Sequence, residues 1–332
     1  MTAAAVAVLL ARLVAGQAAE PVVLKVGTVA PVGSAWHEAL KDLGQRWEQA
    51  SRGRVKLRIY AGGTQGNEGE LQRKLAIGQL QVVALSNVGL HDLVREPQAF
   101  SVPLLFRSDE EVACAFKRVR ERLDAALRAR GIVAVQWSRL GAAALFCGAR
   151  LATPAEVQGA KVFAWDGDPA SADAWRAAGF HPVVLSSTDL VTALSTKMID
   201  CVGQLPLFML TTRAFERARY VLDLPWGYVL GATIVKREAW ERIPADLRGT
   251  LLSIAEEVSA RLDADARKIE ADAREAMRRE GLTVVPASPE AWRPVLERSW
   301  PVLRGESFPA PFFDAVVAAR DACRAEGGAA GR

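Results

Sequence analysis

TPAEVQGAKVFAWDGDPASADAWRAAGFHPVVLSSTDLVTALSTKMIDCVGQLP (residues 153–206) is the stretch that decides the fold of this chain. A Thr-Pro start and Gly159 bound a short helical turn, and three β-rich runs then alternate with two helical segments. The β-rich runs are residues 161–165, 180–185 and 199–204. This alternation is typical of a parallel α/β sheet, whose ligands bind outside the carboxyl ends of the strands. We therefore expect the site to include residues 165–166, 186–187 and 204–206.

Length and composition predict a globular protein with two domains. The chain has 332 residues, of which 50% are hydrophobic and 24% are charged. Its net charge of +4 is small, and the basic residues are spread among acidic ones. A nucleic-acid surface would show clustered basic residues with aromatic residues between them. We therefore expect no nucleic-acid partner.

The first 19 residues have the composition of an export signal. Residues 2–14 are almost wholly apolar, and small residues near Ala18 and Ala19 suit a cleavage site. Arg12 interrupts the apolar run and no positive charge precedes it, which a start codon assigned too far downstream would explain. The alternative is a cytosolic N-terminal helix. No other run is long enough to span a membrane, so we expect a soluble periplasmic protein.

The four cysteines leave two possibilities open. Their spacing contains no CxxC pair, so a metal site is not expected; they are Cys114, Cys147, Cys201 and Cys323. Export would permit disulfides, but the sequence does not assign a pairing, and buried free thiols are at least as plausible.

The first part of the chain repeats the same strand and helix plan. Strands are expected at residues 22–29, 54–60 and 82–86, with helices between them, one of which carries Trp36. The glycine-rich loop 61–69, which contains Asn67, lacks the Gly-Lys-Ser/Thr ending of a phosphate-binding loop. We interpret it as a tight turn. Ser86 and Asn87 follow the third strand and become candidate ligand contacts.

The later part of the chain predicts how two lobes are joined. Gly141 separates two strands and marks a crossing between lobes, and residues 246–280 form one helix long enough to span both. We expect lobe I at residues 20–138 and about 217–245, and lobe II at 139–216 and about 281–326. The residues from 327 to 332 are expected to be a tail.

Catalytic patterns are missing from the sequence. The three histidines are isolated in different segments, and no Gly-x-Ser-x-Gly elbow is present. Asp166 and Asp168 are spaced like paired carboxylates, but between glycine and proline they are better interpreted as shaping a turn. We therefore expect no enzyme, no cofactor and no metal.

Aromatic side chains gather near the predicted strand ends. They are Trp137, Phe163, Trp165, Phe208, Trp226 and Tyr228. About half of such residues are expected to be core, because aromatic side chains are generally well buried. Trp165 is the strongest candidate for a ligand contact, since it is the last residue of its strand before a polar turn.

Four segments carry a resemblance to a known family. They are GTVAPVGSAWHEALKDLGQRWEQASRGRVKLRIYAGG (27–63), EPQAFSVPLLFRSDEE (96–111), TPAEVQGAKVFAW (153–165) and ALSTKMIDCVGQLP (193–206). Together they resemble the extracytoplasmic solute-binding subunits of tripartite ATP-independent periplasmic (TRAP) transporters of the DctP type. The resemblance covers almost the whole mature chain and implies a two-lobed fold with a hinge, a small-molecule solute and TRAP membrane subunits as partners.

The chain departs from this family where organic acids are bound. Members that bind acids usually carry an arginine where this chain has Phe163, and a second arginine in the place of residues 142–144, which are alanines. Guanidinium groups are suited to pairing with carboxylates. The form FAWDGD, with YVLDLPWGYVLGAT (220–233), is similar to a subgroup that works with a tetratricopeptide-repeat partner and whose pockets look apolar.

We therefore expect a small, apolar or neutral ligand. Candidate contacts are Trp165, Phe163, Asp166, Gln204, Ser86, Asn87, Trp137, Trp36, Asn67, Phe208 and Trp226. Two alternatives stay open: an organic carboxylate held by a different cation, and an enzyme or a non-binding interaction protein on the same scaffold.

Overall fold

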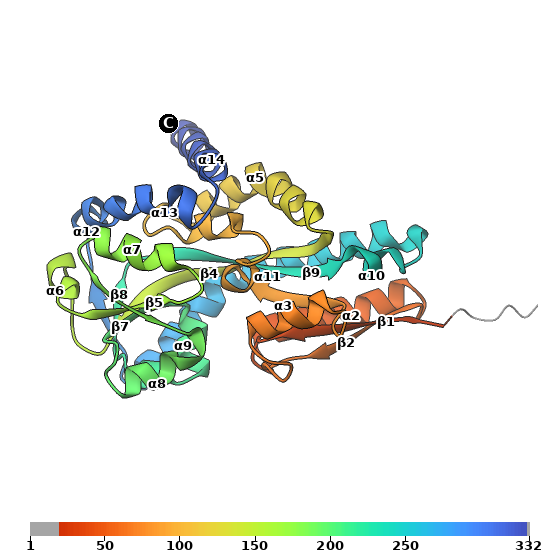
Figure 1. Cartoon of the computed structure of the whole chain (residues 1–332), viewed down its shortest axis with the longest axis horizontal. Helices are drawn as coiled ribbons and strands as arrows, with labels where there is room; N and C mark the ends of the chain where they lie inside the picture. Colours follow the sequence, from red (N-terminus) through yellow and green to blue (C-terminus); the bar gives the residue numbers. More distant parts are fainter. Residues whose placement is uncertain (1–19, 331–332) are drawn as a thin grey trace, which may run out of the picture.

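The computed structural model describes residues 20–330, so the predicted signal peptide and residues 331–332 lie outside it. Figure 1 shows two lobes that share one mixed β-sheet, with strand order β2-β1-β3-β9-β4-β7-β5-β6 and with β8 paired to β4 and β10. The strands are β1 (Val22–Thr28), β2 (Val55–Tyr60), β3 (Val82–Ser86), β4 (Ile132–Cys147), β5 (Lys161–Trp165), β6 (His181–Leu185), β7 (Cys201–Gln204), β8 (Tyr220–Asp223), β9 (Gly227–Lys236) and β10 (Thr283–Pro286).

Each lobe contains the parallel unit that the sequence predicts. In the first lobe β1 pairs in parallel with β2 and β3, and in the second lobe β5 pairs in parallel with β6 and β7. The predicted two-lobed α/β fold is therefore confirmed. The helices are α2 (Ala35–Ala50), α3 (Glu68–Ala76), α4 (Asn87–Leu90), α5 (Asp109–Ala129), α6 (Pro154–Gln158), α7 (Pro169–Ala177), α8 (Leu190–Ser195), α9 (Pro206–Thr211), α10 (Arg237–Glu241), α11 (Ala245–Arg279), α12 (Pro289–Leu296), α13 (Trp300–Glu306) and α14 (Ala310–Ala330).

Local side chains explain where several helices begin. Thr153 and Glu156 form a reciprocal capping box at the start of α6. The hydroxyl of Ser108 accepts the N–H of Glu111 at the start of α5. At the other end of the chain α14 continues to Ala330, so the prediction of a tail from residue 327 is wrong for residues 327–330.

The strand β4 passes through both lobes without a break. We predicted two strands on either side of Gly141, but residues 132–147 form one strand whose first part pairs with β9 and whose last part pairs with β7 and β8. Its register with β9 shifts between Ala134 and Gln136 and again between Arg139 and Gly141. Gly141 has a φ of 119°, which a residue with a Cβ rarely adopts. The predicted crossing thus coincides with a bulge in a continuous strand.

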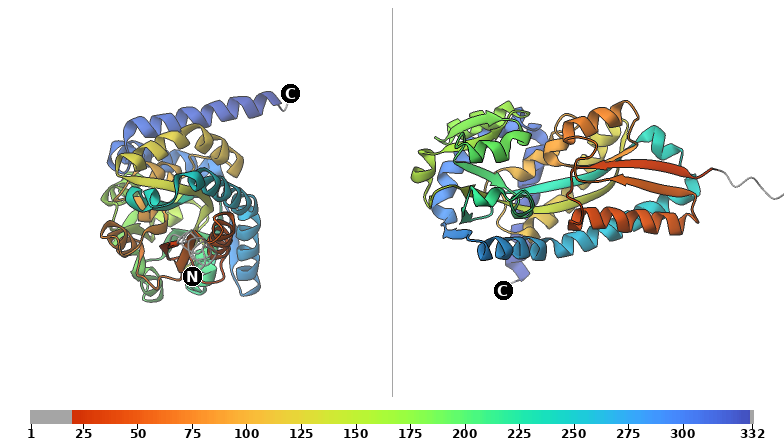
Figure 2. Two further views of the ribbon diagram at one scale, coloured as in Figure 1. Left: turned by 90° about the vertical axis from the view of Figure 1, so that its right-hand side faces the viewer. Right: turned by 90° about the horizontal axis from the view of Figure 1, so that it is seen from below.

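The helix α11 runs along both lobes, as Figure 2 shows, and packs against α2, β4 and α9. Three of its side chains bind the backbone of β4 where the bulges lie. Ser259 donates to the carbonyl oxygen of Trp137, Asp263 accepts the N–H of Arg139 at 2.8 Å, and Glu270 accepts the N–H of Ala142. The helix therefore satisfies backbone groups of the strand that joins the lobes.

The predicted lobe boundaries differ from the packing in two places. The strand β8 was expected in lobe I, but it pairs with β10 and with the last residues of β4 in the second lobe. The helix α14 was expected in lobe II, but it packs against α5 of the first lobe. Both differences arise because long-range pairing, and not chain order, decides where these elements lie.

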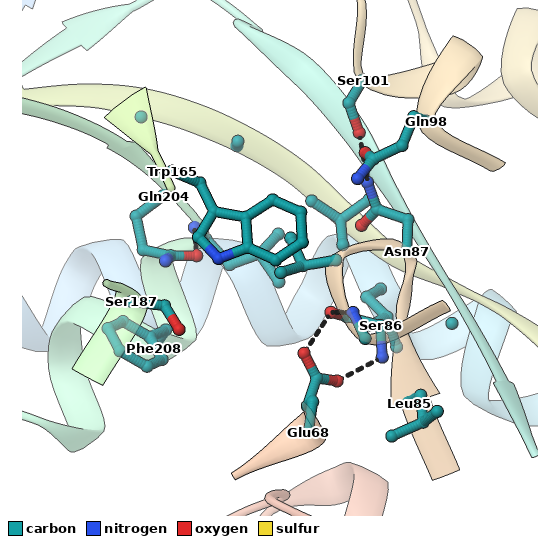
Figure 3. Close-up of a pocket in the computed structure, with 18 of the residues that line it drawn as sticks. Glu68, Leu85, Ser86, Asn87, Gln98, Ser101, Trp165, Ser187, Gln204 and Phe208 are labelled. Atoms are coloured by element: carbon teal, nitrogen blue, oxygen red, sulfur yellow. Dashed lines mark hydrogen bonds between the residues drawn. The ribbon is translucent and has the colours of Figure 1, made fainter. Parts of the chain in front are cut away.

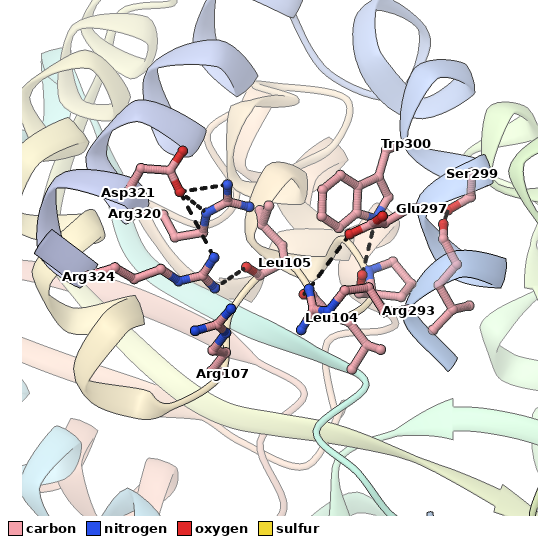
Figure 4. A network of polar contacts seen from close by, with 12 residues as sticks. Leu104, Leu105, Arg107, Arg293, Glu297, Ser299, Trp300, Arg320, Asp321 and Arg324 are labelled. Carbon is pink, nitrogen blue, oxygen red and sulfur yellow. Dashed lines mark hydrogen bonds and ion pairs between the residues drawn. The ribbon is translucent and has the colours of Figure 1, made fainter. Parts of the chain in front are cut away.

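C-terminal side chains hold the proline-broken segment 102–105. Trp300 donates to the carbonyl oxygen of Pro103 at 3.1 Å, and Arg293 and Arg324 donate to those of Leu104 and Leu105, each at 3.2 Å (Figure 4). These bonds satisfy carbonyl groups that belong to no strand. They fix a segment of which Val102 and Pro103 line the space between the lobes.

All four cysteines are paired, which excludes the free thiols that the sequence left open. Cys114 of α5 is bonded to Cys323 of α14, and Cys147 of β4 to Cys201 of β7. Disulfides persist in oxidising compartments. Among residues 20–330 no helix is both long and apolar enough to cross a bilayer.

The contact between Glu270 and β4 predicts a pH-dependent stability. Burial raises the pKa of Glu270 to about 7, and the nearby Asp109 adds to this effect, while the N–H of Ala142 and Arg274 oppose it. A raised pKa means that stability present below about pH 4.5 is lost as the pH rises through about 7. Glu270→Gln should therefore be more stable than the wild type at about pH 8, by about 2 to 3 kcal/mol.

Urea denaturation of both proteins at about pH 5 and about pH 8 measures this difference. Asp265→Asn, an exposed acid on the same helix, is the matched control and should leave the pH dependence unchanged. Equal pH dependence in the wild type and Glu270→Gln would contradict the assignment.

Candidate ligand-binding site

A cavity of about 890 Å³ lies between the two lobes. It opens at the carboxyl ends of β3, β5 and β7, where the sequence predicted a site, and residues 165, 186–187 and 204–205 lie on its wall. Cavities of this size hold small organic molecules. Because both lobes contribute to the wall, a molecule inside would contact both.

Most of the predicted contact residues lie on the wall of this cavity. They are Trp36, Asn67, Ser86, Asn87, Phe163, Trp165, Gln204, Phe208 and Trp226. Figure 3 shows five of them together with Glu68, Gln98 and Ser101. Whether each contacts a ligand stays a prediction.

Two predicted contacts, Trp137 and Asp166, do not lie on the wall. The indole of Trp137 turns toward α5 and donates to Asp124 at 2.7 Å, so it belongs to the core of the first lobe. Asp166 is exposed in the turn after β5, where its N–H donates to Leu185. The side-chain alternation in β4 was not assigned from the sequence, and a strand end alone does not show which way a side chain points.

A hydrogen-bonded carboxylate forms part of the first-lobe wall. Glu68 accepts the N–H of Ser86 at 2.5 Å and its hydroxyl at 2.8 Å (Figure 3). Burial raises the pKa of Glu68, and the bonds from Ser86 and Gly89 oppose the rise. This arrangement fixes the start of α4 and places an acid, not a cation, at the end of β3.

The amide of Asn87 has a fixed orientation. Its Nδ2 donates to Gln98 and, at 2.8 Å, to the hydroxyl of Ser101, which itself donates to the carbonyl oxygen of Tyr228 at 3.0 Å. Since the single proton of Ser101 is used on Tyr228, Asn87 must present its NH₂ group there. Its Oδ1 is then left buried without a hydrogen-bond partner among the described residues.

Trp165 connects the two lobes across the cavity. It is the last residue of β5, and its ring stands edge-on to His91 of the first lobe, with ring centroids 5.4 Å apart. The ring also covers Gly167, where an added Cβ would lie 2.1 Å from it. Burial lowers the pKa of His91, although Asp168 and Asp92 act in the opposite direction. The contact is therefore between an aromatic ring and a largely neutral imidazole at pH 7.

The ionisable side chains on the wall are mostly acidic. Glu68, Asp92 and Asp168 line the cavity, whereas Arg73 is the single Lys or Arg of residues 20–330 that does so. The side chain of Arg73 is 72% exposed and lies near Glu70, at 3.9 Å. Lys161 is not on the wall, because it donates to the carbonyl oxygen of Lys197. The wall thus offers no buried guanidinium or ammonium group.

A polar row that the sequence reasoning missed lies on the sheet face of the cavity. Gln136 and Thr233 are cross-strand partners in β4 and β9, and Ser138 lies two residues along β4. All three are buried and on the wall, and Gln136 donates to Ser138 at 3.2 Å. The alternation of polar side chains in an otherwise apolar strand was the signal that could have found them.

Two lobes that both line one cavity between them have the arrangement of a solute-binding protein. The chain matches the family model of bacterial extracellular solute-binding proteins, family 7 (DctP), over residues 26–307, and it belongs to this family. Family members are solute-binding proteins and not enzymes, and they work with TRAP membrane subunits in the periplasm, so the expected family and location are confirmed.

Individual relatives are distant but similar over most of their length. The C4-dicarboxylate-binding periplasmic protein DctP of Rhodobacter capsulatus is 24% identical and covers 80% of each chain. The crystal structure of the sugar acid binding protein DctPAm of Advenella mimigardefordensis with galactonate aligns with a TM-score of 0.83 at 17% identity, over 92% of this chain and 99% of that one. DctP7 of Bordetella pertussis, with pyroglutamic acid, has a TM-score of 0.80 at 19% identity, over 90% and 99%.

The contact of Trp165 with Gly167 predicts a local effect of substitution. Gly167→Ala should push the ring toward the cavity, because its Cβ cannot lie 2.1 Å from the indole. The near-UV circular dichroism should change, while stability falls by only about 1 kcal/mol, since the ring can move into open space. Gly159→Ala, where the nearest atom is 3.5 Å away, is the control and should leave the spectrum unchanged. An unchanged spectrum in Gly167→Ala would show that the ring does not lie over this glycine.

Proposed function

We propose that this protein captures a small organic solute that is apolar or neutral over most of its surface and delivers it to TRAP membrane subunits. One observation carries the proposal: no buried cation lines the cavity among residues 20–330, and Phe163 stands on the wall where acid-binding relatives are expected to carry arginine. A ligand without a carboxylate needs no such cation.

The free energy of binding would come mainly from apolar contact. Burying apolar surface stabilises a complex by about 25 cal/mol per Å². Phe163, Trp165 and Phe208 offer such surface from the second lobe, and Trp36 offers it from the first. The amide of Gln204 and the hydroxyl of Ser187 would orient the ligand, since a few polar groups usually do so in such cavities.

An organic carboxylate is the second candidate, because several relatives are named for one. The R. capsulatus relative is a C4-dicarboxylate-binding protein, and a Sulfurospirillum deleyianum structure contains succinate. In this chain Arg73 would have to leave Glu70 and turn inward to pair with the acid. A carboxylate would also meet Glu68 and Asp168 on the wall, which disfavours it.

Closure of the lobes over the ligand would follow from contacts to both, with β4 and α11 as the connection. The tetratricopeptide-repeat partner expected from the subgroup resemblance stays a proposal. The lobe boundaries that we favour place β8 in the second lobe and α14 in the first.

A ligand panel tests the proposal. Toluene and hexan-1-ol should raise the melting temperature of the wild type, whereas succinate and galactonate should leave it unchanged. The reason is that an unpaired carboxylate loses several kcal/mol of solvation in a cavity without a cation. A rise with succinate or galactonate alone would contradict the proposal and favour the second candidate.

A substitution that should create acid binding tests the same proposal in the opposite direction. Phe163→Arg places a guanidinium on the wall and should create succinate binding that the wild type lacks, with an affinity gain of about tenfold or more. Phe163→Met, which removes the ring without adding charge, is the matched control. If Phe163→Arg folds, by its circular dichroism, and binds succinate no better than Phe163→Met, the position does not decide the ligand class.

A further inference from the structure

Two acids on the cavity wall, Glu68 and Asp168, form no ion pair within residues 20–330, and Asp168 has the fewer hydrogen-bond donors. It is 7% exposed, and the hydroxyl of Ser307 donates to its Oδ1 at 3.1 Å. Within residues 20–330 no group donates a hydrogen bond to its Oδ2 and no Lys, Arg or His forms an ion pair with it. This oxygen is not among the fully buried atoms without a partner, so solvent can reach it. Buried carboxylates are normally paired with a cation.

The helix that follows does not explain this carboxylate. Asp168 is the N-cap residue of α7, but its side chain makes no capping hydrogen bond. From the sequence we expected Asp168 to shape a turn. In the structure only its backbone does so, because its carbonyl oxygen accepts the N–H of Ser171. The free oxygen is thus left for a partner from outside the chain.

Nearby positive groups are engaged elsewhere or uncharged. Arg95, whose charge acts on His91, donates to the carbonyl oxygen of Glu306 at 2.7 Å. Burial lowers the pKa of His91, so the imidazole is largely neutral at pH 7. Asp92, exposed at the rim, adds a second negative charge to this part of the wall. The acidic side chains near Asp168 are therefore not matched by a positively charged side chain of the described residues.

The ring of Trp165 lies against the turn that carries Asp168. The ring of Trp165 covers Gly167, the residue before Asp168, and both Trp165 and Asp168 line the cavity. An ammonium group is attracted by a carboxylate and by the face of an indole, and this pair is how proteins recognise amines. Phe163 and Phe208 extend the apolar surface away from this end.

We propose that the ligand carries a protonated amine that binds between the Asp168 carboxylate and the Trp165 ring, with its apolar body along the aromatic wall. This inference rests on the proposed function and names its ligand class: an organic amine, instead of the organic acids for which relatives are named. The amine replaces the cation that the protein does not supply.

Three compounds with the same hexyl chain separate the contribution of the head group to binding from that of the apolar chain. Isothermal titration of the full mature chain at pH 7 with hexylamine, hexan-1-ol and hexanoate should rank the amine first, by about tenfold over the alcohol, as expected for one charge-assisted contact. Hexanoate should bind weakest. A hexylamine affinity no better than that of hexan-1-ol overturns the inference and leaves the proposed function standing. Hexanoate as the best ligand, or binding by none of the three, overturns both.

Substitution of the carboxylate locates the effect. Asp168→Asn keeps the size of the side chain and its contact with Ser307, and it should lower hexylamine affinity by about tenfold while hexan-1-ol changes less than about twofold. Asp166→Asn, two positions away and exposed outside the cavity, should change neither. Equal losses for amine and alcohol in Asp168→Asn would assign the residue a structural role and overturn the inference. If Asp168→Asn does not fold, hexylamine titrated against wild type at about pH 11 should lose its advantage, because the amine is then mostly uncharged.

Discussion

A carboxylate that enters a cavity loses solvation worth several kcal/mol unless a cation or several donors replace the water. This constraint decides what the space between these two lobes can hold. Its wall carries Glu68 and Asp168, and the one cation on it among the described residues, Arg73, points toward solvent. Phe163 occupies the place where the family resemblance implies an arginine. The two-lobed fold and the family are shared with relatives named for organic acids, but among the described residues the wall carries no buried cation of the kind that we expect an acid to need.

The connection between the lobes depends on one strand and one helix. Asp263 and Glu270 of α11 accept the backbone N–H groups of Arg139 and Ala142, which lie on either side of the second bulge in β4. A carboxylate that accepts a buried N–H is stabilised by it, yet burial still raises the pKa of Glu270 to about 7. The connection between the lobes therefore contains a glycine with a positive φ, Gly141, beside a carboxylate, Glu270, whose pKa is raised to about 7. Trp165 and His91 add a second contact between the lobes, across the cavity itself.

Local sequence signals were sufficient for most of the elements and for the position of the cavity, although β4 was predicted as two strands. The alternation of strand and helix in residues 153–206, the capping box of Thr153 and the apolar stripe of α11 all follow from local preferences, and the site lies at the predicted strand ends. Long-range pairing was not predictable in this way: β8 joins β10, and α14 is bonded to α5 through Cys114 and Cys323. The direction in which a side chain points was also not predictable from the sequence. Trp137 turned into the core and Asp166 into solvent, whereas Asp168, assigned to a turn, lies on the wall.

The charge of the solute can be read most directly from the molecule that stays bound to the protein when it is produced in a periplasm. Native mass spectrometry of protein purified without unfolding, followed by release and high-resolution mass analysis of the bound species, identifies that molecule. A bound compound that has a mainly apolar body and no carboxylate is the predicted result. Recovery of a dicarboxylate or a sugar acid at one molecule per chain would contradict it.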